Sequence, residues 1–431
     1  MFRLDKDEIT KVCIIGAGPA GLMAAIFAAP RPAQRAAQAG ASTMVIEANA
    51  TPGCKLLLTG GGRCNFTHLT TAEEMTRAFG PKGRFLRYSL HKFPPAKVQQ
   101  FFRRHGLESK VDQTGCVFPV TDRAGDVRDI LSAEAKRLGV RFTFSTKVTA
   151  VTRHAGHFAV SSAGQVILAE KVIIATGGLT WPDTGSTGDG YEFAGQLGHR
   201  VVQPRPSLVP LVALESWPGD LAGTSLENVK ISTSIGKKKI VVTGAMLFTH
   251  DGIGGPAALQ LSRFVTDFLP NEQSPLKIAV DVVSDISETE LEKMILKQAS
   301  DHPKKAVVNI LAEFAPRRVS HVLCGQFDLA ANLPANQLSK GLRIKLLHLL
   351  KTVPLSIVRT RPIAEATMTR GGVDVTEVEP KTMESKICPG LFFAGEILDV
   401  DGPCGGYNLQ MCWSTGALAG SSAAQANTTP Q

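Results

Sequence analysis

Three glycines near the N-terminus have the spacing of a dinucleotide-binding turn: Gly16, Gly18 and Gly21. The first allows a tight turn, the second lets a pyrophosphate approach the main chain, and the third lets helix and strand pack closely. Apolar residues precede the turn and an alanine-rich segment follows it, which is the strand–turn–helix context that the motif requires. The unpaired N–H groups of that helix would face the phosphates. The motif therefore predicts a bound dinucleotide.

A carboxylate at the end of the second expected strand, residues 43–47, fits the same ligand. Glu47 closes this apolar run, and in this fold such an acid accepts hydrogen bonds from ribose hydroxyls. Glu47 lies 26 positions after Gly21, later than the roughly 20 that are typical. The Pro30–Ala39 stretch accounts for the delay, because its prolines interrupt the helical pattern.

A glycine triplet between polar residues forms a second candidate ligand loop, at residues 55–65. Gly60–Gly62 offer no packing surface, so they suit a loop pressed against a ligand. Arg63 can meet a phosphate or an acidic substrate, and Asn65 can hydrogen-bond the edge of a ring. A flexible connector is the alternative interpretation.

The far end of the chain returns to similar signals. Residues 171–178 are an apolar run that ends in two glycines, and residues 390–396 are another that ends in Gly395 and Glu396. A glycine-rich loop at residues 399–408 then leads into a last helix with small residues. Ligand signals at both ends imply a long ligand across the sheet, and FAD is the natural candidate, with Glu396 near its ribityl chain.

Composition favours a soluble, cytoplasmic enzyme. The chain has 431 residues, of which 43% are hydrophobic and 20% charged, as is ordinary for globular proteins. No apolar run is long enough to span a membrane, and the polar first ten residues do not form a secretion signal. Eight scattered cysteines fit a reducing compartment and lack paired metal-ligand spacing, so we expect no metal.

The net charge of +9 is concentrated in one stretch. Residues 82–105 hold seven Lys or Arg and no acid, with aromatic residues between them. This combination is found on nucleic-acid surfaces, but an amphipathic segment with a solvated basic face explains it more simply. We therefore expect a small-molecule substrate rather than a nucleic-acid or membrane partner; the oligomeric state is left open.

The order of these signals predicts an α/β fold with one long insertion. Strands are expected at 140–154 and 157–163. Short apolar strands and then helices fill 201–354, before the nucleotide-binding signals resume. The expected parts are a first dinucleotide-binding segment at 1–200, an inserted β domain at 201–285, an inserted helical domain at 286–354 and a C-terminal segment at 355–431.

Five motifs together resemble a bacterial flavoprotein family, the aminoacetone-oxidase-family FAD-binding enzymes, also described as NAD(P)/FAD-dependent oxidoreductases. The motifs are Gly-Gly-Gly-Arg-Cys-Asn at 60–65, the Ala-Thr-Gly-Gly to Gly-Asp-Gly stretch at 175–190, residues 246–256, residues 382–386, and the stretch from Ala-Gly-Glu to Gly-Gly-Tyr-Asn at 394–408. At a more distant level, residues 175–199 are similar to the flavin subunits of fumarate reductases.

The resemblance implies a glutathione-reductase-type, Rossmann-like FAD-binding domain interrupted by a β domain and a helical domain. It also implies which residues contact FAD, and we add four further candidates for cofactor binding. The implied contacts are Gly16, Gly18, Gly21, Glu47, Lys55, Arg63, Gly395, Glu396, Gly405, Gly406, Tyr407 and Asn408; the added candidates are Asn65, Val148, Thr176 and Gly177.

We therefore predict an FAD-dependent oxidoreductase in which a hydride moves to or from the flavin, either to reduce an activated C=C bond or to oxidise an amine. No second complete Gly-x-Gly-x-x-Gly motif is present, so NAD(P)H would act only as a transient electron donor. The candidates for substrate contact are Arg63, His250, Arg370 and Tyr407, although His250 could simply cap the next helix. The alternatives are an RNA-binding or RNA-modifying flavoprotein and a flavin-based redox sensor that uses Cys404 or Cys412.

Overall fold

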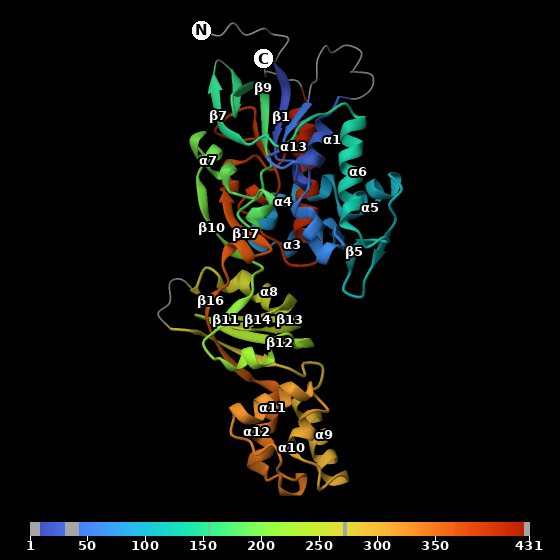
Figure 1. The fold of residues 1–431 in the computed structure, drawn as a ribbon, viewed down its shortest axis with the longest axis vertical. Coiled ribbons are helices and arrows are strands. Elements are labelled where there is room, and N and C mark those ends of the chain that lie inside the picture. The colour runs from blue at the N-terminus through green and yellow to red at the C-terminus, as the bar shows by residue number, and fades with distance from the viewer. Residues whose placement is uncertain (1–8, 31–42, 155, 270–273, 426–431) are drawn as a thin grey trace. The chain divides into compact units, whose positions relative to one another are not determined.

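The computed structural model describes residues 9–30, 43–154, 156–269 and 274–425. The chain divides into two compact units, each taken here by itself (Figure 1). The first comprises Met1–Arg205 and Thr367–Gln431, and the second comprises Pro206–Ala366. Most of the polar start of the chain, and the Pro30–Ala39 stretch beyond Pro30, lie outside the described residues.

A seven-stranded sheet forms the centre of the first unit. Its order is β6-β2-β1-β9-β8-β7, and β18 also pairs with β9. β8 pairs with the first half of β9 and β18 with the second half, so β9 changes neighbour along its length. The strands are β1 (Thr10–Ile15), β2 (Thr43–Ile46), β6 (Arg141–Thr143), β7 (Val148–His154), β8 (His157–Ser162), β9 (Gln165–Ile174) and β18 (Leu391–Phe393).

The parallel strands of this sheet bring the sequence motifs to one edge. β1 pairs in parallel with β2 and β9, and β9 pairs in parallel with β18. Gly16 follows β1, Glu47 follows β2, and Ala175 and Ala394 follow β9 and β18. The predicted α/β fold is confirmed. Ligands of open α/β sheets bind outside the carboxyl ends of the strands, so this edge is where we predict FAD to bind.

Two helices of very different sequence position pack against each other beside the sheet, α1 (Pro19–Ala28) and α13 (Tyr407–Ala423) (Figure 1). A Cβ atom at Gly416 would lie 2.4 Å from the Ala20 carbonyl oxygen, and one at Gly420 would lie 2.2 Å from the Ala24 oxygen. Only glycine permits this approach. The small residues of the last helix therefore serve close helix packing.

The basic stretch forms two amphipathic helices, α4 (Gly83–Lys92) and α5 (Pro95–Arg104). Phe85, Phe102 and the two leucines are buried, whereas Tyr88 and six of the seven Lys and Arg side chains of residues 82–105 are exposed. A small sheet of order β3-β5-β4 lies in the same unit. The remaining elements here are α3 (Ala72–Ala78), β3 (Thr67–His68), β4 (Ser109–Val111), β5 (Cys116–Pro119), α6 (Ala124–Arg137), α7 (Asp189–Gln196), β10 (Val201–Ser207) and β17 (Met368–Val373).

The second unit contains a closed barrel of order β11-β14-β13-β12-β15-β16 and a set of helices. Its core is made mostly of aliphatic side chains from both the barrel and the helices, with Trp217 and Phe248 among them. The strands are β11 (Leu211–Ala213), β12 (Ser225–Ile235), β13 (Lys238–Thr249), β14 (Gly252–Gly254), β15 (Leu276–Asp281) and β16 (Val353–Thr360). The helices are α8 (Gly255–Val265), α9 (Glu288–Asp301), α10 (Val307–Leu311), α11 (Arg317–Gln326) and α12 (Lys340–Lys351).

The division between the units differs from the expected boundaries at 200 and 355. β10 pairs with β17 and so stays with the first unit up to Arg205. β16 pairs with both β11 and β15 and completes the barrel, so the chain returns to the first unit only at Thr367. β10 and β16 lie next to the expected boundaries. The strands that they pair with are distant in sequence, and local sequence patterns do not predict such pairings.

Candidate functional site

The turn between β1 and α1 has the geometry that its three glycines predict. Gly16 has φ +99°, and a Cβ there would lie 2.6 Å from the Ala175 oxygen. At Gly21 a Cβ would lie 1.9 Å from the Gly16 oxygen. At Gly18, by contrast, no heavy atom lies within 4 Å of an added Cβ. The first and third glycines therefore serve packing, whereas Gly18 leaves room for a ligand beside the main chain.

Glu47 is held rigidly at the end of β2, with 7% of its surface exposed. Its Oε2 accepts a hydrogen bond from the Ala17 N–H at 2.6 Å, and its Oε1 accepts from the Asn49 N–H at 2.9 Å and from Asn49 Nδ2 at 2.8 Å. Two carboxylate oxygens offer about four acceptor positions. One position therefore remains for a ribose hydroxyl, next to the glycine turn.

A buried cluster joins four segments around Glu396. Lys55 Nζ lies 2.6 Å from Glu396 Oε2, and Glu396 Oε1 accepts from Thr180 Oγ1 at 3.1 Å and from the Thr369 N–H at 2.9 Å. Lys55 also donates to Thr180. A Cβ at Gly178 would lie 2.1 Å from Thr369 Oγ1, so this glycine is needed for the cluster to form. Lys55 and Glu396 thus bind each other, and their contact with FAD stays a prediction.

Sequence reasoning missed Thr180 and Thr369, although each lies within three residues of a motif glycine or of a named candidate. Thr180 follows the Gly177–Gly178 pair, and Thr369 precedes Arg370. In both cases the sequence offers one signal for a site residue, a small hydroxyl side chain beside a ligand-binding motif.

The loop at residues 55–65 meets the turn before α13. Gly60, Gly61 and Gly62 all have positive φ angles, of 59°, 67° and 87°. Arg63 is exposed, and its guanidinium lies over the Phe118 ring at 4.5 Å, outside the Glu396 cluster. Asn65 instead points inward: its Oδ1 is buried, and no hydrogen-bond partner for it exists among the described residues.

The turn before α13 is closed by main-chain contacts. Gly405 and Gly406 have φ angles of 105° and 88°. A Cβ at Gly406 would lie 2.3 Å from the Thr67 oxygen and 2.7 Å from Asn65 Oδ1. Asn408 is used inside its own loop, since its Oδ1 accepts from the Gly402 N–H at 2.7 Å and its Nδ2 donates to the Gly402 oxygen at 3.1 Å. Asn408 is therefore a structural residue of the turn.

Tyr407 begins α13 and stacks on His68, with ring centroids 4.8 Å apart. His68 Nδ1 lies 3.0 Å from the Gly405 oxygen. Burial raises the pKa of Tyr407, and the nearby Cys116 and Glu74 act in the same direction. His68 was not among the predicted residues; its position three residues after Asn65 was the only signal.

The other candidates of the first unit lie just after the adjacent strands β9 and β18, in β17 and in β7. Thr176 Oγ1 is buried with no hydrogen-bond partner among the described residues, and Gly177 adopts φ +77°. The Gly395 N–H donates to Thr415 Oγ1 at 3.0 Å, which ties the end of β18 to α13. Arg370 pairs with Asp401 at 3.4 Å. Val148 is buried at the start of β7.

His250 lies in the second unit, exposed in the turn between β13 and β14. The N-cap of α8 is Gly254, and no side chain caps it. His250 therefore does not cap the following helix.

FAD fits the first unit on three observations. The space beside Gly18 would admit a phosphate, Glu47 keeps an acceptor position, and two buried oxygens, Asn65 Oδ1 and Thr176 Oγ1, lack partners among the described residues. Buried polar atoms are rarely left unsatisfied in native proteins. A ligand with hydroxyl and amide donors, as FAD has, would satisfy such oxygens.

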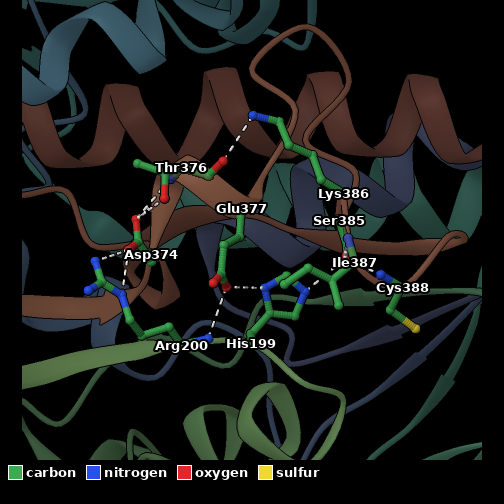
Figure 2. A network of polar contacts seen from close by, with 9 residues as sticks. All are labelled: His199, Arg200, Asp374, Thr376, Glu377, Ser385, Lys386, Ile387 and Cys388. Atoms are coloured by element: carbon green, nitrogen blue, oxygen red, sulfur yellow. Dashed lines mark hydrogen bonds and ion pairs between the residues drawn. The ribbon is translucent and has the colours of Figure 1, made fainter.

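A second buried polar network in this unit has the composition of a hydrolytic triad (Figure 2). His199 Nδ1 lies 3.2 Å from Glu377 Oε2, and His199 Nε2 lies 2.8 Å from Ser385 Oγ. Ser385 Oγ also accepts the N–H groups of Ile387 at 3.0 Å and Cys388 at 2.6 Å. Both its lone pairs are thus occupied, so Ser385 is no nucleophile. The network instead fastens the segment that leads into β18.

The cysteine proposed for redox sensing in α13 is poorly suited to that role. Desolvation raises the pKa of the Cys412 thiol to about 12, and the charge of Glu396 adds to this. A thiol that stays protonated at neutral pH reacts slowly with oxidants.

No helix in the described part of the chain is long and apolar enough to cross a membrane.

Two known bacterial enzymes have sequences similar to this chain over nearly their whole length. The chain is 32% identical over 418 residues to the 3-dehydro-bile acid delta(4,6)-reductase of Clostridium scindens, covering 97% of this chain and all of that one. It is also 32% identical over 405 residues to the ribosomal RNA dihydrouridine synthase of Escherichia coli, covering 93% of this chain and 95% of that one.

A solved flavocytochrome c3 fumarate reductase has a similar fold, with a TM-score of 0.50 at 17% identity over 97% of this chain and 78% of that chain. Residues 10–422 match the family described as HI0933-like protein Rossmann domain. The finer resemblance to aminoacetone oxidases stays a prediction. The chain belongs to the HI0933-like family and is an FAD-dependent oxidoreductase with a Rossmann-type FAD-binding domain.

Proposed function

We propose that this enzyme reduces a C=C bond conjugated to a carbonyl group in a small organic substrate. One observation carries the proposal: the 55–65 loop, β3 and the Gly405–Gly406 turn converge at the start of α13. There Asn65 presents a buried acceptor, and His68 and Tyr407 present proton-bearing rings. Reduction of a C=C bond needs a hydride for one carbon and a proton for the other, so proton-bearing groups are required at such a site.

The residues that would hold FAD divide by the part of the cofactor they suit. The Gly16–Gly21 turn and the N-terminus of α1 suit the pyrophosphate, and Glu47 suits the ribose of the adenosine half. The start of α13 suits the flavin end, because a helix N-terminus stabilises nearby negative charge. When bound and reduced, FAD supplies the hydride.

The names of the relatives support the substrate class. A delta(4,6)-reductase and a dihydrouridine synthase act on different molecules, but both names describe saturation of a C=C bond. In a 3-oxo steroid nucleus and in uracil that bond is conjugated to a carbonyl group. We therefore propose the conjugated bond, rather than one molecular skeleton, as the feature that this site recognises.

NADH or NADPH is the proposed electron donor. The sequence holds one complete Gly-x-Gly-x-x-Gly motif, and we assign it to FAD. The nicotinamide donor would therefore bind transiently and leave before the substrate enters.

The test is anaerobic titration of purified enzyme. We expect a yellow protein that releases FAD on denaturation, is bleached by NADH or NADPH, and regains its colour when a conjugated enone such as 2-cyclohexen-1-one or a 4,6-dien-3-one steroid is added. A saturated ketone of the same skeleton is the control and should restore no colour. Bleaching by a primary amine such as aminoacetone, without reoxidation by any enone, would contradict the proposal and favour amine oxidation.

A base in structured RNA is the second candidate substrate. It is favoured by the exposed cations of α4 and α5, since Arg84 and Arg104 form no ion pair with any described residue. Binding of a hairpin RNA should then weaken steeply with salt, and each phosphate contact removed should lower the slope by about 1. The double variant Arg84→Gln/Arg104→Gln should flatten the slope, whereas the control Lys297→Gln on α9 should not.

A further inference from the structure

A cysteine thiol lies beside the turn that precedes α13. Cys116 begins β5, and its cross-strand partner in β3 is His68. Directly opposite residues of an antiparallel pair project their side chains on the same face. A Cβ at Gly405 would lie 3.4 Å from Cys116 Sγ and 3.5 Å from His68 Nδ1. Cys116, His68 and Tyr407 therefore surround one glycine at the start of α13.

A short polar path connects this thiol to solvent. Thr114 Oγ1 lies 3.1 Å from Cys116 Sγ and 2.7 Å from Asp112 Oδ1. Asp112 Oδ1 also accepts the N–H groups of Thr114 and Cys116, both at 2.9 Å. Asp112 and Thr114 are exposed, whereas Cys116 is half-buried. The path thus runs from water through one hydroxyl to the sulfur.

The charge on Asp112 keeps this path oriented. Burial raises the pKa of Asp112, but hydrogen bonds from Thr114 and from the Cys116 N–H outweigh burial and lower the pKa below its usual value. Asp112 is therefore ionised at neutral pH and acts only as an acceptor. It fixes the Thr114 hydroxyl beside the sulfur, which makes Asp112 a positioning residue.

Tyr407 is the competing proton source, and two observations disfavour it. Burial and neighbouring negative charge raise its pKa, so it is a weaker acid than an ordinary tyrosine. Its ring is covered on one face by His68 and approached edge-on by Phe79, at centroid distances of 4.8 Å and 6.5 Å. Cys116 has the shorter route to water.

We propose that the Cys116 thiol is the proton donor of the reaction, with Thr114 returning the proton from solvent. This proposal rests on the proposed enone reduction. When bound and reduced, FAD would supply the hydride that forms a C–H bond at the β-carbon of the enone, while the S–H bond of Cys116 breaks and its proton forms a C–H bond at the α-carbon. The substrate thereby gains two hydrogens, and the thiolate takes a solvent proton through Thr114. NAD(P)H would supply the two electrons that reduce the oxidised FAD again.

The kinetic test separates the two half-reactions of the holoenzyme by stopped flow. In Cys116→Ala, reoxidation by 2-cyclohexen-1-one should slow at least about 100-fold, the usual contribution of a general acid. Reoxidation by ferricyanide, which requires no protonation of carbon, should change less than about threefold. Cys54→Ala removes a similar half-buried thiol near Thr51 and is the control. Cys116→Ser keeps the shape of the side chain and covers the case in which Cys116→Ala does not fold.

A second readout needs no turnover. Iodoacetamide labelling of Cys116, followed by peptide mass spectrometry, should slow at least fivefold when the apoprotein binds FAD. ADP, which lacks the flavin, should give no such protection. Equal protection by ADP and FAD would place Cys116 away from the flavin and overturn the proposal.

The outcomes also distinguish this proposal from the proposed function. Normal enone reoxidation in Cys116→Ala and Cys116→Ser would overturn the role of Cys116 and leave enone reduction standing. A large loss in Tyr407→Phe together with normal Cys116 variants would assign the proton to Tyr407. Absence of any enone reduction by the wild-type enzyme would overturn both proposals.

Discussion

Two glycine turns precede two helices that pack together, yet they are built in opposite ways. The turn before α1 is largely local: Gly21 fits against the Gly16 oxygen of the same turn, Gly16 fits against the Ala175 oxygen at the end of the adjacent parallel strand β9, and the space beside Gly18 is open. The turn before α13 is assembled from distant segments, since Gly406 fits against the Thr67 oxygen and Asn65 Oδ1. The spacing of residues in the sequence is enough to predict a ligand role for a local turn. For an assembled turn, such a role can be inferred only from the residues that surround it in the structure.

The comparison also separates two uses of glycine. At Gly406 an added methyl group meets backbone, and the φ angle of 88° is one that side-chain-bearing residues rarely adopt. At Gly18 the φ angle is −73° and the space is open. The first glycine is therefore needed for folding, and for the second we predict a role in binding.

The largest expected effect follows from Gly406→Ala. Strain at positive φ adds to the close contact with Thr67, so the free energy of unfolding should fall by about 3 kcal/mol or more. Urea unfolding of the apoprotein measures it. Gly195→Ala is the control, because Gly195 lies in α7 with no heavy atom near an added Cβ, and that change should stabilise by roughly 0.5–1 kcal/mol. Unchanged stability in Gly406→Ala would mean that the turn is not closed as described.

The sequence predicts the local turn better than the assembled one for a physical reason. Gly16, Gly18, Gly21 and Glu47 act through residues near them in the chain or at the ends of adjacent parallel strands, so spacing is sufficient. The roles of Thr180, Thr369 and Cys116 depend on pairings over long sequence separations, such as Thr180 with Glu396, and no local pattern encodes these.

Two predicted candidates show the same limit. The residue type of Arg63 does not reveal that its exposed side chain lies over Phe118, and its contact with FAD or substrate stays a prediction. The residue type of Asn408 likewise does not reveal that its side-chain amide bonds to Gly402 and Pro403, and its contact with FAD stays a prediction. The two compact units divide after Arg205 and after Ala366 rather than at 200 and 355, because β10 and β16 pair with strands far away in the sequence. The type of a residue does not predict which way its side chain points or which distant strand its own strand pairs with.

The next effect concerns Glu47, at the local turn. Glu47→Ala removes the acceptor for ribose and for the Ala17 N–H, and hydrogen bonds to charged groups contribute roughly 1.5–3 kcal/mol each. We expect FAD affinity to fall by about 10- to 100-fold, measured by fluorescence titration of the apoprotein. Glu47→Gln should lose less, because its amide oxygen still accepts. Equal FAD affinity in all three proteins would contradict a role for Glu47 in binding.

A smaller effect concerns the network that fastens the approach to β18 and α13. Burial lowers the pKa of His199, although Glu377 opposes the shift. The unfolded chain therefore binds a proton near pH 6.5 that the folded protein does not, and stability should fall as the pH drops below about 6.5.

His199→Gln should flatten this dependence between pH 7.5 and 5.5 by about 1 kcal/mol, measured by urea unfolding at each pH. The exposed His154 gives the control variant His154→Gln, which should keep the wild-type slope. A steeper slope in His199→Gln would show that Glu377 outweighs burial.

The smallest effect on folding, and the sharpest test of the comparison, is expected from Gly18→Ala. The extended backbone at Gly18 suits alanine, with φ −73° and ψ −177°, and an added Cβ meets no heavy atom within 4 Å. The apoprotein should therefore keep its stability or gain up to about 1 kcal/mol, because alanine restricts the unfolded chain. FAD should nevertheless bind at least fivefold more weakly, since the new methyl group would occupy the space proposed for the pyrophosphate. Gly18→Ala thus reverses the pattern of Gly406→Ala, which lowers stability before any ligand is added. If Gly18→Ala binds FAD with wild-type affinity, the phosphates do not approach the main chain at this glycine, and the open space beside it has another use.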